Sequence, residues 1–244
     1  DGTNYSGWQT QPDATTVQET IEQALTLVAR SPEPIAILGA GRTDAGVHAR
    51  GMVAHVDLPM SPDEARQLIY RTDRYLPHDI ALYDIRPVRE EAHARFSATS
   101  RTYRYYVTLR KDPFQEARML RLYFPLDFDR MNEAAGRLKD FTDFTSFSKL
   151  HTDVKTNNCR VTEAYWQAGA EEGQWIFTIT ADRFLRNMVR AVVGTLFQVG
   201  KGRLSVEDFC AVIEAKDRGQ AGSSAPAHAL YLEQVGYPED LYLD

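Results

Sequence analysis

The chain has 244 residues, of which 43% are hydrophobic and 25% are charged, and its formal net charge at neutral pH is −6. This composition is typical of a globular protein and excludes a low-complexity or disordered chain. No apolar run approaches the roughly 18 residues that a membrane helix needs, and no basic-then-apolar signal segment opens the sequence. We therefore expect a cytoplasmic protein with no membrane partner, in which Cys159 and Cys210 stay reduced.

The charge is distributed unevenly along the chain. Residues 86–121 carry a net charge of +5 and residues 181–203 a net charge of +4, so the rest is strongly acidic. A negative net charge alone argues against a nucleic-acid partner. Two basic segments in an acidic chain nevertheless suit a protein that meets a polyanion on one face.

The first part of the chain predicts two helices and three strands. Thr16 with Glu19 fits a capping box before a helix that runs toward Arg30, and Ser61 before Pro62 opens a second helix. Short apolar runs predict strands at residues 35–38, 52–57 and 80–85. Because residues 39–46 are rich in glycine, we expect Asp44 on a loop between the first two strands.

The second part begins with a segment rich in Tyr, Thr and Val, residues 100–109, which predicts a long strand joining the two halves. Further strands are expected at residues 159–167, 175–181 and 230–235, and helices at residues 129–138, 184–199 and after Ser205. The alternation predicts an α/β (α+β) protein with a large, mainly antiparallel mixed sheet and helices packed on it. We expect two α/β halves, residues 1–98 and 99–244.

The segment from Gly41 to His48 contains the first candidate for chemistry. Glycines on both sides of Asp44 let the backbone turn sharply and let a ligand approach closely. An aspartate in a turn also often bonds only to its own loop. The sequence alone leaves both readings of Asp44 open.

A second candidate is the predicted helix at residues 184–199. At about 100° per residue, a single stripe holds Arg183, Arg186, Asn187, Arg190 and Gly194. Arginine side chains match the geometry of phosphate and carboxylate groups. A solvated charged face is the alternative, although such faces usually mix acidic and basic residues.

The third candidate is the strand that begins at Arg101. Arg101, Tyr103 and Tyr105 are predicted on one side, and Arg104 and Tyr106 on the other. Aromatic rings stack on bases and arginines bind phosphates. A half-buried strand with tyrosines in the core explains the same pattern equally well.

Metal and nucleotide sites are not predicted. His48 and His55 lie near Asp44, but their spacing matches no zinc or iron pattern. The sequence contains no Walker loop and no complete dinucleotide fingerprint. We therefore expect neither a metal nor any other cofactor.

With these motifs in place, the chain resembles the tRNA pseudouridine synthase A family over nearly its whole length. The resemblance rests on these segments: residues 1–3, 7–11, 16–18, 41–48, 97–105, 143–147, 184–194 and 225–226. Two positions depart from the family pattern, with Asp73 where Asn is common and Ala229 where Gly is common.

The resemblance implies roles for three residues. Asp44 would be the nucleophile, Tyr103 would lie against the target base, and Arg190 would pair with the Asp44 carboxylate. It also implies two similar halves around a central active-site cleft, no cofactor, and a homodimer that binds one tRNA. The family's usual targets are the uridines at tRNA positions 38, 39 and 40, in the anticodon stem-loop.

Further residues are predicted to contact RNA. Arg42 or His48 would fill the place of a flipped-out base, and four arginines would contact phosphates: Arg101, Arg104, Arg183 and Arg186. Two other functions remain as alternatives: an RNA-binding module without catalysis, and a metal-dependent phosphodiesterase that uses Asp44, His48 and His55.

Overall fold

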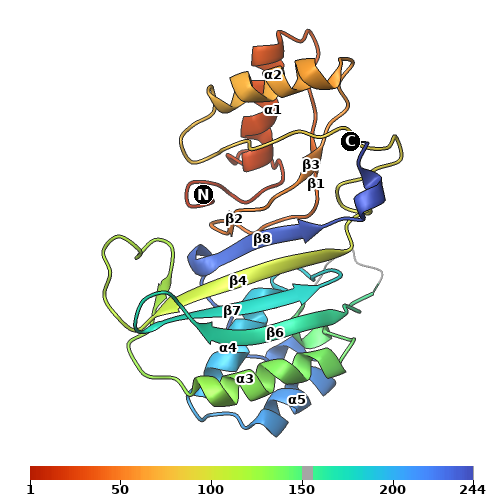
Figure 1. Cartoon of the computed structure of the whole chain (residues 1–244). Helices are drawn as coiled ribbons and strands as arrows, with labels where there is room; N and C mark the ends of the chain where they lie inside the picture. The colour runs from red at the N-terminus through yellow and green to blue at the C-terminus, as the bar shows by residue number, and fades with distance from the viewer. Residues whose placement is uncertain (150–155, 244) are drawn as a thin grey trace. The chain divides into compact units, whose positions relative to one another are not determined.

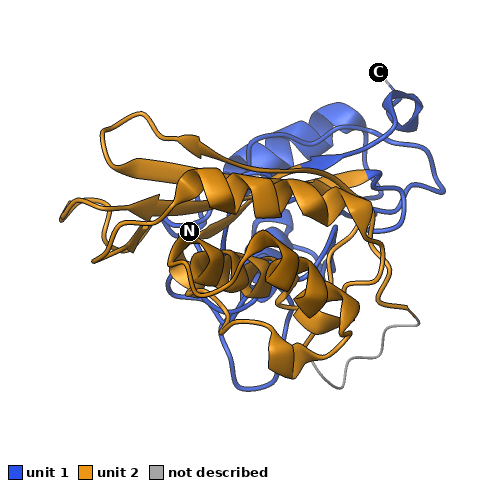
Figure 2. Ribbon diagram, turned by 90° about the horizontal axis from the view of Figure 1, so that it is seen from below, with its two compact units in different colours: residues 1–99, 235–244 blue, residues 100–234 orange. Residues whose placement is uncertain are grey.

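A computed structural model describes residues 1–149 and 156–243. The chain divides into two compact units, residues 1–99 with 235–244, and residues 100–234 (Figure 2). Among the described residues, no helix is long and apolar enough to cross a membrane.

The first unit is built on two helices that pack against each other, α1 (Val17–Ala29) and α2 (Pro62–Asp73) (Figure 1). Its strands are short: β1 (Leu38–Gly39), β2 (His48–Ala49) and β3 (Ala54–His55), of which β1 and β3 pair antiparallel. Buried side chains from both helices and the segments beside them form the core: Trp8, Ile21, Leu25, Ile37, Leu68 and Leu76.

Both helices of the first unit begin where the sequence predicts. The Thr16 side chain accepts a hydrogen bond from the backbone N–H of Glu19 at the start of α1. At α2, Ser61 and Glu64 form a complete capping box, and Pro62 is the first helical residue. Local capping chemistry therefore fixes these two helix starts.

The strands predicted in the first unit are much shorter than expected, and residues 80–85 form no strand. Helix side chains take the backbone donors that strand partners would need. The N–H of Ile35 bonds to Thr26 Oγ1 and that of Ile37 to Glu22 Oε1, both on α1. Similarly, the N–H of Leu82 bonds to Asp73 Oδ1 at the end of α2. Ile35, Ile37 and Leu82 therefore bond to the helices rather than to neighbouring strands.

The second unit contains a sheet with the order β8-β4-β7-β6, in which β5 pairs parallel with β4. Its strands are β4 (Ser100–Thr108), β5 (Leu120–Arg121), β6 (Val161–Ala168), β7 (Gln174–Ala181) and β8 (Leu230–Gly236). The pairs β4–β7 and β6–β7 are antiparallel. This arrangement confirms the mixed α/β class with a mainly antiparallel sheet.

Three helices lie on one side of this sheet: α3 (Phe128–Arg137), α4 (Met188–Gly200) and α5 (Val206–Glu214) (Figure 1). Tyr105 of β4 is fully buried and meets Phe197 of α4 edge to face. Trp166 of β6 also contacts Phe197. Short 3-10 helices complete the chain at Leu138–Asp140, Thr145–Phe147, Arg218–Gln220, Ala227–Ala229 and Glu239–Leu241.

The start of α4 corrects the sequence prediction. The helix begins at Met188 rather than residue 184, because Asn187 has the left-handed backbone conformation, with a φ of 67°. Asparagine adopts this conformation more readily than most residues. Arg183 and Arg186 therefore precede the helix, and the predicted single stripe of arginines on one helix is wrong.

Candidate active site

Asp44 lies at the first position of a tight turn between β1 and β2. The N–H of Val47 donates to the carbonyl oxygen of Asp44 at 3.2 Å, and Gly46 has a φ of +74°. A positive φ at this position is typical of a type II turn, where glycine is favoured. Asp44 itself is half-buried. The structure thus confirms the predicted loop between two strands.

The N-terminal segment holds this turn through its backbone. The N–H of Gly46 donates to the carbonyl oxygen of Tyr5 at 3.2 Å. Gly7 has a φ of +93°, and a Cβ atom there would lie 2.3 Å from the carbonyl oxygen of Thr43. At this distance only glycine fits. We call residues 2–7 the N-terminal clamp.

The two histidines near Asp44 each bond to the backbone. His48 is 3% exposed, and its Nδ1 lies 3.0 Å from the Gly2 nitrogen and 3.1 Å from Asp1 Oδ1. Because the Gly2 N–H can only donate, Nδ1 must accept, so the contact with Gly2 is the hydrogen bond. His55 Nδ1 likewise accepts from the N–H of Ala94 at 3.0 Å. Arg42, in contrast, is exposed.

Arg190 lies in the first turn of α4 and is held by a segment that crosses the helix. Arg190 Nε donates to the carbonyl oxygen of Ala225 at 2.7 Å, and the N–H of Ala225 donates back to the Arg190 carbonyl at 2.9 Å. One turn later, a Cβ atom at Gly194 would lie 1.8 Å from the Ser223 carbonyl oxygen. We call residues 221–226 the crossing segment.

Side chains that the sequence prediction did not assign fix the crossing segment. Ser224 Oγ accepts hydrogen bonds from Asn187 Nδ2 at 2.6 Å and from Arg218 Nη2 at 3.0 Å. Thr195 Oγ1 accepts from the N–H of Gly222 at 2.9 Å. Arg218 is far from the motif in sequence, so no local spacing pointed to it.

Tyr103 and Tyr105 share one side of β4 but differ in their surroundings. Tyr105 is buried and its hydroxyl donates to the Pro226 carbonyl at 2.9 Å. Burial raises the pKa of Tyr105 above its ordinary range, although the charge of Arg190 opposes this. Tyr103 is half-buried, and its ring meets that of Phe184 edge to face at 5.1 Å. Tyr105 therefore belongs to the core, while Tyr103 stays partly accessible.

The predicted RNA-binding arginines of the second unit occupy different settings. Arg101 Nη1 donates to the Asp182 carbonyl at 2.7 Å, and Asp182 Oδ1 accepts from the N–H of Arg183 at 2.7 Å. Arg104 Nε is buried without a hydrogen-bond partner in the described part of the chain. Arg186 is exposed. Arg101 thus bonds to Asp182 through its guanidinium, and Arg183 through its backbone N–H.

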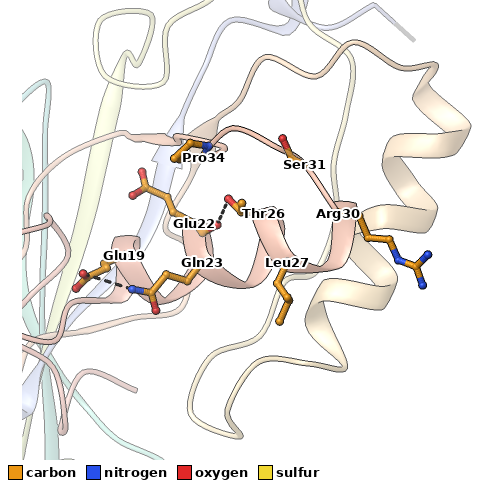
Figure 3. A pocket seen from close by; sticks show the side chains of 8 residues that line it. All are labelled: Glu19, Glu22, Gln23, Thr26, Leu27, Arg30, Ser31 and Pro34. Carbon is orange, nitrogen blue, oxygen red and sulfur yellow. Dashed lines mark hydrogen bonds between the residues drawn. The ribbon is translucent and has the colours of Figure 1, made fainter.

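A hollow on the outer face of α1 contains none of the candidate residues (Figure 3). Its polar side chains include Glu19, Glu22 and Arg30. Glu22 Oε1 already accepts bonds from Gln18 Nε2 and from the N–H of Ile37. A surface with two carboxylates does not suit RNA, so we assign it no part in the site.

Comparison with known proteins identifies the family. A tRNA pseudouridine synthase family model matches residues 1–97 and 138–238, which include Asp44 and Arg190 but not β4. The tRNA pseudouridine synthase A of Porphyromonas gingivalis is 63% identical over 243 residues, covering 99% of this chain and 96% of that protein.

Two further relatives carry the same name. The Parabacteroides distasonis protein is 58% identical, covering 99% of this chain and 94% of its own, and a Streptococcus thermophilus protein is 38% identical, covering 97% and 96%. These matches decide between the alternative functions, against an RNA-binding module without catalysis and against a metal-dependent phosphodiesterase. The chain therefore belongs to the tRNA pseudouridine synthase family and is an isomerase that converts uridine to pseudouridine in tRNA.

Proposed function

We propose that this enzyme modifies uridines at positions 38, 39 and 40 in the anticodon stem-loop of tRNA, with Asp44 as its nucleophile. The observation that carries the proposal is the turn itself. A half-buried carboxylate stands at the first position of a turn that the N-terminal clamp holds by its backbone. A nucleophile must be held close to its productive geometry, and a rigid turn serves this need.

The reaction defines what the protein must supply. The C1′–N1 bond of uridine breaks, C1′ joins C5, the C5 proton leaves and N1 gains a proton. Reactants and products have the same oxidation state, so the protein's part is to position, stabilise and move protons. The carboxylate of Asp44 acts in its ionised form, and pairing with the Arg190 guanidinium would favour that form.

We further propose that Tyr103 receives the target base after it leaves the helical stack. Its ring is half-buried and meets that of Phe184 edge to face, so part of the ring is accessible for contact with uracil. Arg42, which is exposed, is the better placed residue to fill the vacated position, with His48 as the buried support of the same loop.

The remaining arginines would bind the tRNA backbone. Arg101, whose guanidinium bonds to the Asp182 carbonyl, and Arg183, which follows Asp182 in the chain, would bind phosphates, and Arg104 and Arg186 would add contacts at other points. Affinity for tRNA should then fall steeply as salt rises. We propose that the enzyme works in the cytoplasm as a homodimer, in which residues 1–98 provide the nucleophile and residues 99–244 provide Tyr103 and Arg190.

Tritium release from tRNA labelled at C5 of uridine tests the assignment, because each turnover frees the C5 hydrogen. The native chain should release tritium and Asp44→Asn should not, while both bind tRNA with similar affinity. Asp140→Asn, at an exposed aspartate in the 3-10 helix that follows α3, is the matched control. Equal release by Asp44→Asn and the native chain would remove Asp44 from the mechanism.

A further inference from the structure

The geometry points to Tyr5 and Asp79 as positioning residues for the reaction. We propose that the hydrogen bond between them sets the position of the turn that carries Asp44. Neither residue belongs to the candidate site, and neither needs to touch the substrate. The inference rests on the proposed role of Asp44.

The turn is bonded to the backbone of Tyr5. Within the turn, the N–H of Val47 bonds to the Asp44 carbonyl, whereas the N–H of Gly46 bonds outside it, to the carbonyl oxygen of Tyr5. The bond from Gly46 therefore makes the position of Asp44 follow the position of the Tyr5 backbone.

The Tyr5 side chain is fixed in turn by Asp79. Tyr5 is 7% exposed, and its hydroxyl donates to Asp79 Oδ1 at 2.7 Å. Asn4 Nδ2 donates to the other carboxylate oxygen, Oδ2, at 3.3 Å. Two neighbouring residues of the N-terminal clamp thus bind the two oxygens of one carboxylate.

Both groups keep the ionisation state that this bond requires. Burial, followed by the bond to Asp79, raises the pKa of Tyr5 to about 12, so the hydroxyl remains a donor at neutral pH. Burial alone would raise the pKa of Asp79, but the bonds from Tyr5 and Asn4 leave it below its ordinary value. The contact is a charge-assisted hydrogen bond, which is shorter and stronger than a neutral one.

Asp79 is itself anchored to the helical layer of the first unit. The N–H of Ile80 donates to the Pro77 carbonyl at 3.0 Å, which closes a turn around Asp79. Three residues later, the N–H of Leu82 bonds to Asp73 Oδ1 at the end of α2. Hydrogen bonds, joined by the short stretches of chain between them, therefore link α2 through Asp79 and Tyr5 to the turn of Asp44.

The rate of reaction should depend on this pair even where the fold persists. Displacement of a catalytic group by about 1 Å can lower the rate about 100-fold. A small relaxation of the clamp thus suffices to slow the chemistry while the fold persists.

The test compares Tyr5→Phe and Asp79→Asn with Tyr231→Phe in single-turnover tritium release at saturating enzyme. Tyr231 is also a buried tyrosine, 7% exposed, whose hydroxyl donates to a backbone carbonyl, that of Arg118. With enzyme in excess, a misfolded fraction does not change the saturated rate constant. We expect Tyr5→Phe to lower this constant about 10-fold, with an unchanged dissociation constant for tRNA, and Tyr231→Phe to leave it near the native value.

The double variant of Tyr5→Phe with Asp79→Asn supplies the second readout. If the two residues act through their shared bond, the double variant should be no slower than the slower single variant. A native rate constant in Tyr5→Phe, or additive losses in the double variant, overturns the inference. If Tyr5→Phe does not fold, a native rate constant in Asp79→Asn overturns the inference instead.

Asp44→Asn, measured in parallel, separates this failure from that of the proposed function. If Asp44→Asn is inactive while Tyr5→Phe matches the native chain, only the positioning role is lost. If Asp44→Asn turns over normally, the nucleophile assignment is lost, and the positioning inference is lost with it.

Discussion

The turn that carries Asp44 and the helix that carries Arg190 are each held by a neighbouring segment, but the chemistry differs. The N-terminal clamp meets the turn backbone to backbone, through the bond from Gly46 to Tyr5 and the close approach at Gly7. The crossing segment meets α4 through side chains as well, since Arg190 and Asn187 each donate to it.

This difference teaches which substitutions each region should tolerate. The backbone contact at the turn depends on the absence of side chains at its glycines and, through Tyr5, on the bond to Asp79. A side-chain clamp depends on the identity of several polar residues, each of which contributes about 1 kcal/mol. Substitutions at the glycines of the clamp should therefore have larger effects than substitutions of single polar residues at the helix.

The strongest test of the comparison is Gly7→Ala. A methyl group there would overlap the Thr43 carbonyl, and the φ of +93° is strained for alanine. We expect a loss of about 3 kcal/mol in the free energy of unfolding and a fall of about 100-fold in the single-turnover rate constant. Urea denaturation and tritium release measure the two effects.

Gly41→Ala is the matched control for stability. A Cβ atom at Gly41 meets nothing within 4 Å, although this glycine lies in the same motif. Its unfolding free energy should stay within about 0.5 kcal/mol of the native value. An equally large loss of stability in both variants would mean that the clamp at Gly7 is not what holds the turn.

Gly194→Ala applies the same change to the helix. Its methyl group would overlap the Ser223 carbonyl oxygen, so the crossing segment must move away from α4. This movement would break the hydrogen bond from Arg190 Nε to the Ala225 carbonyl. We expect a loss of about 2 kcal/mol and a fall of about 10-fold in rate. Gly136→Ala, in α3 with nothing within 4 Å, should instead stabilise the protein slightly. Similar behaviour of the two variants would contradict a close crossing at Gly194.

The starts of α1, α2 and α5 were predictable from the sequence because capping is local. Ser61 with Glu64 and Ser205 with Asp208 both form the expected capping boxes. The long strand at residues 100–108 and the turn of Asp44 were also predicted, since dense aromatic and β-branched residues and flanking glycines are local signals.

The errors arose where a distant or unusual contact decides the conformation. Thr26, Glu22 and Asp73 take the N–H groups of segments that read as strands, and nothing within those segments reveals this. Asp73, which departs from the family pattern, still accepts the bond from Leu82. The left-handed Asn187 shortens α4, because one residue outweighs the apolar periodicity before it.

Ser224→Ala should have a smaller effect than Gly194→Ala, because it only removes the shared acceptor of Asn187 and Arg218. The two donors are half-buried and can turn partly to water. We expect a loss of about 1 kcal/mol and a fall of no more than about 5-fold in rate. Ser223→Ala, next to it and exposed, should change neither quantity. A loss as large as that of Gly194→Ala would show that side chains, rather than the close crossing, dominate this region.

The smallest expected effect is a pH dependence in the first unit that the backbone clamp does not explain. Burial lowers the pKa of His55, the charge of His93 lowers it further, and Asp57 opposes both. The unfolded chain therefore binds a proton at His55 more readily than the folded one, so stability is full above about pH 6.5 and falls as pH drops through the folded pKa.

His55→Asn keeps an acceptor for the Ala94 N–H but does not titrate. Its unfolding free energy should fall less than that of the native chain between about pH 7 and pH 5, by under about 1 kcal/mol. Equal slopes of unfolding free energy against pH in the two proteins would locate the pH dependence elsewhere. Catalysis at neutral pH should be the same in both, because this histidine holds residues 93–97 and not the turn of Asp44.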